Sequence, residues 1–416
     1  MKRYAEYKDT GVAFLGEIPL EWTISKLKYC VKVRNIKKNY LEGIYVGLEN
    51  IEPLNGRYIE VNNQEINGVS SEFVSGDVLF GKLRPYLGKC IVAEFNGMCS
   101  TEFLVLEPLK VCNRYLKYWF LSAPVVDAIN ASTYGAKMPR ANWDHIGEMA
   151  LPLPAKCVQT SIANYLDTKV NAIDATITDK DKQIRLLEEK QVSIITTAVT
   201  KGINSTTEMK DSGTEWLGYI PSHWRVVPAK ALFAQSKETR HETDVQLTAS
   251  QKYGIISQED YMERQNYKIV LADKGLENWK HVEPNDFIIS LRSFQGGLEI
   301  SYIPGCITWH YIVLKPKAGV EPEYFKWLFK SPRYIQALQR TANFIRDGQD
   351  LRFSNFVQVP LPLIPMDEQK EIAEYLNKET ARIDSIIADI TEQIEKLKEY
   401  RQSVISEVVT GKVAVE

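Results

Sequence analysis

The sequence repeats its own beginning. Residues 9–28, DTGVAFLGEIPLEWTISKLK, return as DSGTEWLGYIPSHWRVVPAK at residues 211–230. A later segment does the same, because LPLPAKCVQTSIANYLDTKVNAIDATI from Leu151 is matched by LPLIPMDEQKEIAEYLNKETARIDSII from Leu361. The two pairs keep the same order and nearly the same separation, so two units of similar plan fill almost the whole chain. A repeat of this length predicts duplicated domains rather than a solenoid of short units, so one chain imitates a dimer.

The composition is that of an ordinary globular protein. A chain of 416 residues, 44% hydrophobic and 25% charged, allows roughly two to four domains, and each repeated unit is large enough to bury its own core. No apolar run is long enough to cross a bilayer and the start carries no secretory segment, so we expect a cytoplasmic protein that does not associate with membranes. The six cysteines lack metal-binding spacing and matching positions in the two units, which predicts reduced, structural thiols and no metal site.

Each unit follows the same plan. It opens with the motif L-G-x-I-P-x-x-W, at Leu15 and again at Leu217, whose glycine and proline predict a fixed turn that places the tryptophan in a core. Short strand-like segments follow. An aromatic helix pair comes next, from Arg114 and again from Glu323, and the helical spacing of its aromatic residues indicates core positions rather than base-stacking platforms.

Each unit ends in a stretch that has the period of a long amphipathic helix. From Leu166 and from Leu376 the seam positions alternate in steps of four and three, which is the pattern of a heptad seam. Neither stretch contains proline or glycine, so each helix can run for roughly 40 residues, or about 60 Å. The apolar face of such a helix needs a packing partner. In the simplest arrangement the two helices pair antiparallel and act as a spacer between the domains. In the alternative arrangement each helix packs against its own domain.

These patterns together predict the α/β (α+β) fold class. We expect two similar globular domains, each followed by a long helix, with the helices pairing as an antiparallel coiled coil of pseudo-two-fold symmetry. The expected boundaries are residues 1–150 for the first domain, 151–203 for the central helix, 204–360 for the second domain and 361–416 for the C-terminal helix.

No catalytic signature occurs in the sequence. The phosphate-binding loop, the dinucleotide-binding glycines, H-E-x-x-H, G-x-S-x-G and the N-P-P-[YF] motif of amino-methyltransferases are all missing. The run Glu188-Glu189-Lys190 imitates the end of a nuclease motif, but it lies on the expected long helix without a companion acid at a strand end. We therefore expect a chain that is not an enzyme and that binds no cofactor and no metal of its own.

The plan as a whole resembles the specificity subunit of a type I restriction-modification enzyme, and the resemblance covers the whole chain. The residues that carry it, besides the two tryptophan motifs, are Leu151, Pro152, Leu153, Gln159, Ile162, Ala163, Tyr165 and Leu166, with Leu361, Pro362, Leu363, Pro365, Glu368, Gln369, Ile372, Ala373, Tyr375 and Leu376. The first copy departs from the usual acidic helix entry, since it has Lys156-Cys157-Val158 where the second has Met366-Asp367-Glu368. Acidic residues favour a helix N-terminus through the helix dipole, so the first helix start is expected to be slightly weaker.

The resemblance implies a subunit with two target-recognition domains, each of which reads one half of a split, asymmetric sequence in double-stranded DNA. It also implies two copies of a modification subunit, which carry S-adenosylmethionine and methylate adenine, and restriction subunits that add translocation and cleavage driven by ATP and Mg²⁺. Such partners share the phosphate contacts, which agrees with a net charge of only −2. The alternatives are a two-lobed scaffold that binds only proteins and, more distantly, a nuclease or methyltransferase of unrecognised type.

Candidate DNA-binding residues come from two segments in each domain. One segment follows a predicted strand, GKLRPYLGK or LRSFQGG, and the other is a polar loop, STYGAKMPRANW or TANFIRDGQDLRF. Arginine and lysine can bond guanine edges in the major groove, and asparagine and glutamine can pair with adenine. The candidates are Lys82, Arg84, Tyr86, Lys89, Lys137, Arg140 and Asn142 in the first domain and Arg292, Ser293, Gln295, Arg346, Gln349 and Arg352 in the second.

The candidates divide by their position in the repeat. Arg84 and Arg292 occupy equivalent positions, so we expect them to hold a phosphate or an internal carboxylate rather than to read a base. Specificity is expected from the residues that differ between the two polar loops, although unconstrained surface loops diverge in the same way. These residues are Lys137, Asn142, Arg346 and Gln349. The expected docking site for the modification subunits is the helix surface from Ile177 to Leu187 together with the first turns of the long helices. The residues named for these turns are Gln159, Ile162, Tyr165, Gln369, Ile372 and Tyr375.

Overall fold

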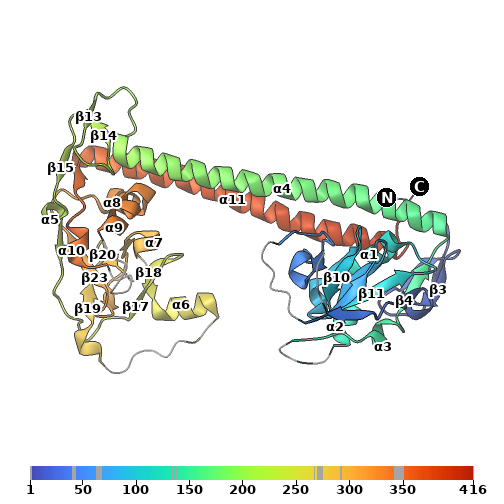
Figure 1. Ribbon diagram of the computed structural model, residues 1–416. Helices are drawn as coiled ribbons and strands as arrows, with labels where there is room; N and C mark the ends of the chain where they lie inside the picture. The colour runs from blue at the N-terminus through green and yellow to red at the C-terminus, as the bar shows by residue number, and fades with distance from the viewer. Residues whose placement is uncertain are drawn as a thin grey trace. The chain divides into compact units, whose positions relative to one another are not determined.

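The computed structural model describes residues 2–39, 44–61, 68–133, 135, 138–266, 268, 275–290, 293–341 and 351–415. The chain divides into two compact units, Met1–Asp181 with Ile390–Glu416, and Lys182–Asp389. Each unit holds one globular domain and part of each long helix, α4 (Lys156–Lys201) and α11 (Met366–Val409), which are green and red in Figure 1. The mixed α/β fold with two domains, each followed by a long helix, is therefore confirmed. In the described ranges no helix is both long and apolar enough to span a bilayer.

The repeated tryptophan motif forms the same small element in both units. It contains the strands β2 (Glu17–Pro19) and β14 (Tyr219–Pro221), which pair antiparallel and in equivalent register with the preceding strands β1 (Tyr7–Asp9) and β13 (Met209–Asp211). Its glycine has a positive φ in each copy, 63° at Gly16 and 64° at Gly218, and glycine adopts this conformation without strain. Trp22 and Trp224 are buried, as predicted.

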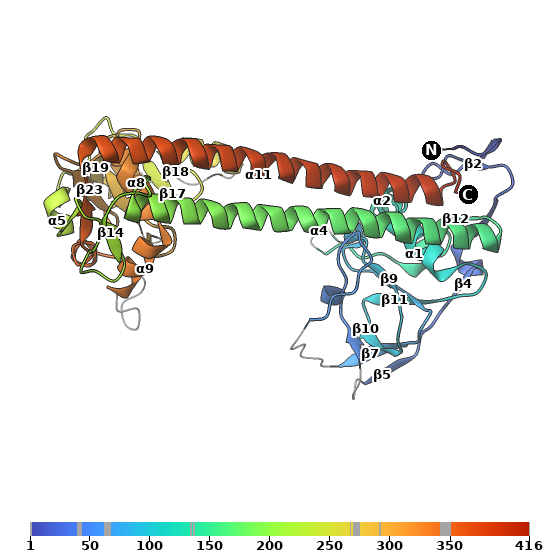
Figure 2. The ribbon, with the colours of Figure 1, turned by 90° about the horizontal axis from the view of Figure 1, so that it is seen from above.

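A four-stranded antiparallel sheet forms the central layer of the first domain. Its strand order is β4-β11-β8-β9 (Val31–Val33, Phe103–Pro108, Val78–Gly81 and Cys90–Val92). Because successive strand residues face opposite sides, Phe80 and Leu104 join the core formed with helices α1 (Asn113–Leu121) and α2 (Ala123–Ala131), whereas Leu79 and Val105 join a second core. The second core includes residues of the other sheet, β5-β7-β10-β6 (Lys37–Asn39, Val69–Phe73, Gly97–Ser100 and Tyr45–Val46), seen from above in Figure 2.

The second domain is built on the same principle. Its central sheet has the order β16-β23-β20-β21 (Phe233–Gln235, Ile312–Pro316, Phe287–Ile289 and Glu299–Ile300). Phe287 and Ile289 face the core formed with α8 (Pro322–Lys330) and α9 (Pro332–Arg340), and Ile288 faces a second core. That second core includes residues of the antiparallel pairs β17–β18 (Leu247–Ser250 with Gly254–Ser257) and β19–β22 (Lys280–Val282 with Gly305–Ile307).

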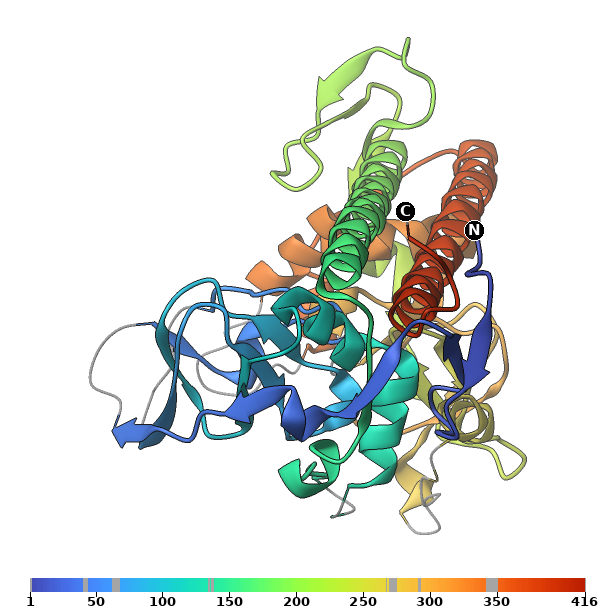
Figure 3. The same ribbon diagram turned by 90° about the vertical axis from the view of Figure 1, so that its right-hand side faces the viewer.

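Each unit also contains short strands and helices outside the sheets described above. The strand before each long helix pairs with the strand after the tryptophan motif, β12 (Ala150–Leu153) with β3 (Thr23–Lys26) and β24 (Leu361–Leu363) with β15 (Arg225–Val227). The remaining described helices are α3 (Trp143–Ile146), α5 (Ala229–Leu232), α6 (Gln258–Gln265), α7 (Ser293–Gly296), α10 (Phe353–Phe356) and the 3-10 turns η1 (Leu27–Tyr29), η2 (Leu48–Asn50), η3 (Pro85–Leu87) and η4 (Leu276–Asn278). The two ends of the chain meet in the first unit, where Ala414 N donates to Lys2 O at 2.9 Å (Figure 3).

The long helices contain 46 and 44 residues and run antiparallel within each unit. In the first unit Arg401 Nη1 lies 2.5 Å from Asp174 Oδ1, and Lys180 Nζ donates to Gln393 Oε1 at 2.6 Å. In the second unit Gln191 Nε2 donates to Asp384 Oδ1 at 2.8 Å. Each domain also packs on these helices, since Leu166 and Val408 belong to the first core and Val199 and Leu376 to the second. The two arrangements weighed from the sequence therefore occur together.

Candidate nucleic-acid interface

In the first domain the turn after β8 lies beside the last described residues of the later polar loop, 138–142. Strand β8 is buried along its whole length, and the chain emerges from it at Lys82. Backbone hydrogen bonds join this turn to the later loop, because Ala141 N donates to Lys82 O at 3.0 Å and Arg84 N donates to Pro139 O at 2.8 Å. Lys82 and Arg84 thus lie close to Arg140, although they are far from it in the sequence.

Positive charge exceeds negative charge at this place. Arg140 Nη2 forms an ion pair with Glu102 Oε1 at 2.7 Å. Burial lowers the pKa of Lys82, and the nearby cations Arg140 and Lys37 add to this shift while Glu102 opposes it. One carboxylate therefore lies among three cations, and the excess charge favours an anion such as a DNA phosphate.

The other residues of the first turn differ in their exposure. Arg84 and Tyr86 are exposed, and Arg84 is one of the few residues other than glycine in the described ranges with a positive φ, 52°. Lys89 is half-buried, and its Nζ donates to the backbone oxygen of Leu48 at 2.6 Å. Burial also lowers the pKa of Lys89. This lysine therefore has an internal partner, and its contact with DNA stays a prediction.

Asn142 and Arg352 occupy equivalent places, at the N-caps of the short helices α3 and α10. Asn142 caps its own helix, since its Oδ1 accepts a hydrogen bond from Asp144 N at 3.2 Å. In the second domain the capping bond comes from Asn355 instead, whose Oδ1 accepts from Arg352 N at 3.0 Å. Arg352 is exposed. The same place therefore presents an amide in one domain and a guanidinium in the other.

Arg352 lines a hollow of about 620 Å³ in the second domain. Lys280 and His310, which were not predicted from the sequence, line the same hollow. Lys280 donates to a backbone carbonyl, and the ring of His310 stacks on the exposed Trp309 with centroids 3.4 Å apart. No sequence motif marks Lys280 or His310 as lining such a hollow. One sequence signal points to His310, because it aligns in the repeat with Glu102, the carboxylate of the first domain's cluster.

The remaining DNA-binding candidates have different outcomes. Four of them lie outside the described residues: Lys137, Arg292, Arg346 and Gln349. Gln295 is exposed on α7. Ser293 is buried, and its Oγ accepts a hydrogen bond from Ser290 N at 2.8 Å. A buried hydroxyl in this state does not reach a base, so the prediction for Ser293 is corrected.

Most of the predicted docking residues lie in the cores of their own units. The buried ones are Gln159, Ile162, Gln369 and Ile372. Each glutamine accepts a backbone hydrogen bond, Gln159 Oε1 from Cys112 N at 2.7 Å and Gln369 Oε1 from Glu321 N at 2.8 Å. The prediction that these four residues contact a partner is therefore corrected, because the first turns of the helices face their own domains. The two candidates that keep exposed surface are Tyr165 and Tyr375.

Comparison with known proteins relates this architecture to one family. Residues 221–396 match the family model of the type I restriction modification DNA specificity domain. The putative type I restriction enzyme MjaX specificity subunit of Methanocaldococcus jannaschii is 24% identical over 97% of this chain and 96% of that protein. The type I restriction enzyme EcoDI specificity subunit of Escherichia coli is 25% identical over 37% of this chain and 36% of its own length.

Solved structures share the fold over nearly the whole chain. A chain from a structure of the type I R-M system, concerned with complex assembly and conformational transition, has a TM-score of 0.67 at 17% identity and covers 95% of this chain and 99% of that one. The HsdS subunit from Thermoanaerobacter tengcongensis has a TM-score of 0.52 at 16% identity, with 95% and 98% covered. The duplicated plan, the matched domain and the full-length relatives agree. Over nearly its whole length the chain is similar to type I restriction-modification specificity subunits, and residues 221–396 match their DNA specificity domain.

Proposed function

We propose that this chain is the non-catalytic subunit that reads the DNA target of a type I restriction-modification complex. Each domain reads one half of a split, asymmetric sequence in double-stranded DNA. The family supports the general role. The duplicated scaffold supports two reading modules, and the different side chains that the modules carry at equivalent places support two different half-sites.

The observation that carries the proposal is the exchange at the N-caps of α3 and α10. Asn142 stands at this place in the first domain and Arg352 in the second, and both are exposed. In the major groove an asparagine pairs best with adenine and an arginine with guanine. Two modules with one backbone plan and different polar groups at the same place favour different base pairs, as a reader of an asymmetric target requires.

The charged cluster of the first domain has the complementary role. Lys82 and Arg140 lie near the carboxylate of Glu102, and Arg84 is exposed in the turn that follows Lys82. Backbone hydrogen bonds fix the chain at Lys82 and Arg84. Contacts to phosphate position a protein on DNA without reading its sequence. We assign these cations to the phosphate backbone, and the exposed Tyr86 next to them to contacts with the sugar-phosphate edge.

The proposal includes partners, because the chain has no catalytic motif. Two copies of a modification subunit, which carry S-adenosylmethionine, dock one to each half, and restriction subunits bring ATP and Mg²⁺. Tyr165 and Tyr375 lie at equivalent positions near the helix starts and keep exposed surface. They are therefore the predicted docking residues that a partner can reach in this structure. A measured complex with one modification subunit for each chain contradicts this assignment.

A binding selection on random duplexes tests the function. The full chain, with and without its cognate modification subunit, is incubated with a random duplex pool, and the bound fraction is sequenced. We expect enrichment of a motif with two different half-sites separated by a gap of fixed length. A palindromic or uninterrupted motif contradicts the asymmetric reading, and enrichment of no motif under either condition favours the protein-binding scaffold.

A further inference from the structure

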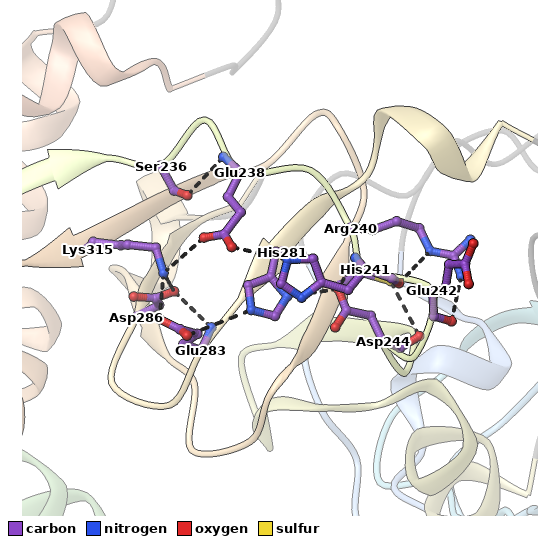
Figure 4. Close-up of polar contacts among 11 residues, drawn as sticks. Ser236, Glu238, Arg240, His241, Glu242, Asp244, His281, Glu283, Asp286 and Lys315 are labelled. Atoms are coloured by element: carbon purple, nitrogen blue, oxygen red, sulfur yellow. Dashed lines mark hydrogen bonds and ion pairs between the residues drawn. The ribbon is translucent and has the colours of Figure 1, made fainter.

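Three side chains that commonly bind metals meet in the second unit. Glu238 and His241 lie on the segment between β16 and β17, and His281 lies on β19. One potential ligand atom from each of the three lies within 4.8 Å of the others. Figure 4 shows this cluster together with the acidic residues around it. None of the three was a candidate for DNA binding or docking.

His281 is held in an orientation that suits a metal ligand. Its side chain is 8% exposed, and its Nδ1 lies 2.8 Å from Oδ2 of Asp244, whose side chain is 6% exposed. A carboxylate at one ring nitrogen fixes the proton there, so the other nitrogen, Nε2, keeps its lone pair for a metal. The same Oδ2 accepts a hydrogen bond from His241 N at 2.8 Å. Asp244 therefore orients one histidine and anchors the backbone of the other.

His241 and Glu238 supply the open side of the cluster. Oε1 of Glu238 lies 3.2 Å from Nε2 of His241, and the two side chains are 42% and 51% exposed. The rings of His241 and His281 stack with centroids 3.9 Å apart and an angle of 24° between their planes. Lone pairs in nearly parallel planes do not converge on one point, so a bound ion requires one ring to tilt. His241 can make this change because it is exposed.

The charges around the cluster favour a cation. Glu283 lies 4.0 Å from His281 Nε2 and forms an ion pair with Lys315 at 2.8 Å. Lys315 also lies 3.5 Å from Asp286 and 3.6 Å from Glu238. Lys315 is thus close to three carboxylates, and Asp244 is a fourth carboxylate near the histidines. The guanidinium of Arg240, in the same segment, donates to backbone carbonyls. A dication between the histidines reduces this excess of negative charge.

We propose that Glu238, His241 and His281 bind one transition-metal dication, with Zn²⁺ as the best match. Two imidazoles and one carboxylate form a donor set typical of zinc, and the exposed side leaves a fourth position for water. Asp244 is the positioning residue for His281. The ion links the segment after β16 to β19, two parts of the domain that are about 40 residues apart. This differs from the expectation of no metal, which rested on the spacing of the cysteines and on the missing catalytic motifs.

Metal titration of the full chain tests the proposal. The chain is purified with a chelator, which is then removed, and Co²⁺ and Zn²⁺ are titrated separately. We expect one Co²⁺ for each chain with visible d–d absorption, displacement of Co²⁺ by Zn²⁺, and a Tm that rises with Zn²⁺ concentration. Absence of stoichiometric Co²⁺ and Zn²⁺ binding overturns the site.

Matched variants separate this site from adventitious binding. Glu238→Gln and His241→Asn change exposed side chains, so the fold is retained, and each should lower the Zn²⁺ affinity by at least about tenfold. His223→Asn is the control, because His223 Nε2 lies 2.8 Å from a carboxylate oxygen of Glu368 in the same unit and His223 is in no potential metal-binding group among the described residues. We expect His223→Asn to bind Zn²⁺ like the unchanged chain. Equal losses in His241→Asn and His223→Asn overturn the assignment.

Discussion

Asn142 has a structural role as well as a proposed base-reading role. Its Oδ1 caps α3 through Asp144 N, and its side chain is exposed. Asn142→Ala should lower the free energy of unfolding by about 1 kcal/mol and remove roughly 1–3 kcal/mol of discrimination at one base pair. Asn142→Ser keeps a capping oxygen and should lose only the discrimination. Urea unfolding and binding to duplexes with single substitutions measure the two effects. If Asn142→Ser keeps both properties, Asn142 is only a cap.

Arg84 is assigned to phosphate, and this gives a different prediction. Its side chain is exposed, and its φ of 52° places it in the left-handed region. Arg84→Ala should weaken binding to all duplexes alike and reduce the slope of log K against log salt by about 0.9, the value for one phosphate contact. Arg84→Gly is the control for backbone strain, because glycine accepts this φ without cost. Loss of affinity for only one base sequence contradicts the assignment.

Residue-level prediction from the sequence succeeded where neighbours in the chain decide the outcome. The buried tryptophans and the glycine turns follow from a local motif, and the structure has them as predicted. The prediction for Ser293 was wrong because its burial depends on the surrounding fold. Lys89 has a partner that no local pattern shows, the backbone carbonyl of Leu48. Lys280 was missed because a strand residue carries no local signal of the hollow it lines.

At the scale of elements, two buried glutamines fasten the long helices to their domains. Gln159 accepts from Cys112 N and donates to Pro154 O at 2.9 Å, and Gln369 makes the matching contacts in the second unit. Gln159→Ala leaves a buried donor and acceptor unpaired and should lower the free energy of unfolding by roughly 1–3 kcal/mol.

The neighbouring exposed Thr160 provides the control for this prediction. Thr160→Ala should change the unfolding free energy by no more than about 0.5 kcal/mol. Urea unfolding compares the two variants, and affinity for the modification subunit is measured where both are folded. A loss of partner binding in Gln159→Ala without loss of stability restores the docking role that the structure argues against.

The ion pair between the long helices is the second prediction at this scale. Arg401 and Asp174 are 10% and 16% exposed, so their charges are largely removed from water. Arg401→Leu leaves the Asp174 carboxylate without its partner and should lower the unfolding free energy by roughly 2–3 kcal/mol. The double variant Asp174→Leu with Arg401→Leu restores an apolar seam and should recover most of the loss. Thermal unfolding of the unchanged chain, the single variant and the double variant measures these differences in stability. An equal loss of stability in the single and double variants contradicts the pairing of Arg401 with Asp174.

The long helices were predictable because their heptad pattern extends over many turns, and the structure confirms both of them. The sheets were less predictable. Most of their strands contain two to five residues, and such runs give little periodic signal. Their order, such as β4-β11-β8-β9, joins segments that are distant in the sequence, so the pairing depends on contacts that local patterns do not encode.

At the scale of the whole molecule, both long helices are shared between the two compact units. The boundaries fall at Asp181 in α4 and at Asp389 in α11, whereas the sequence suggested boundaries at the ends of the helices. The repeat alone could not show this division, because it reveals which segments are similar and not which segments pack together. It follows that a change of helix length at these two boundaries leaves the contacts inside each unit intact.

The same boundaries allow a test of whether the helices set the gap between the half-sites. Seven residues are inserted after Asp181 and seven after Asp389, which keeps the heptad phase on both helices. The insertion lengthens each helix by about 10.5 Å, so the gap should grow by up to about three base pairs while both half-sites stay the same. Insertion in α4 alone disturbs the register with α11 and should destabilise the chain. A methylated-adenine map, from single-molecule sequencing of cells that carry each variant with its partners, shows the gap directly. An unchanged gap in the paired variant refutes the idea, because spacing that ignores helix length must be set within the domains or by the partners.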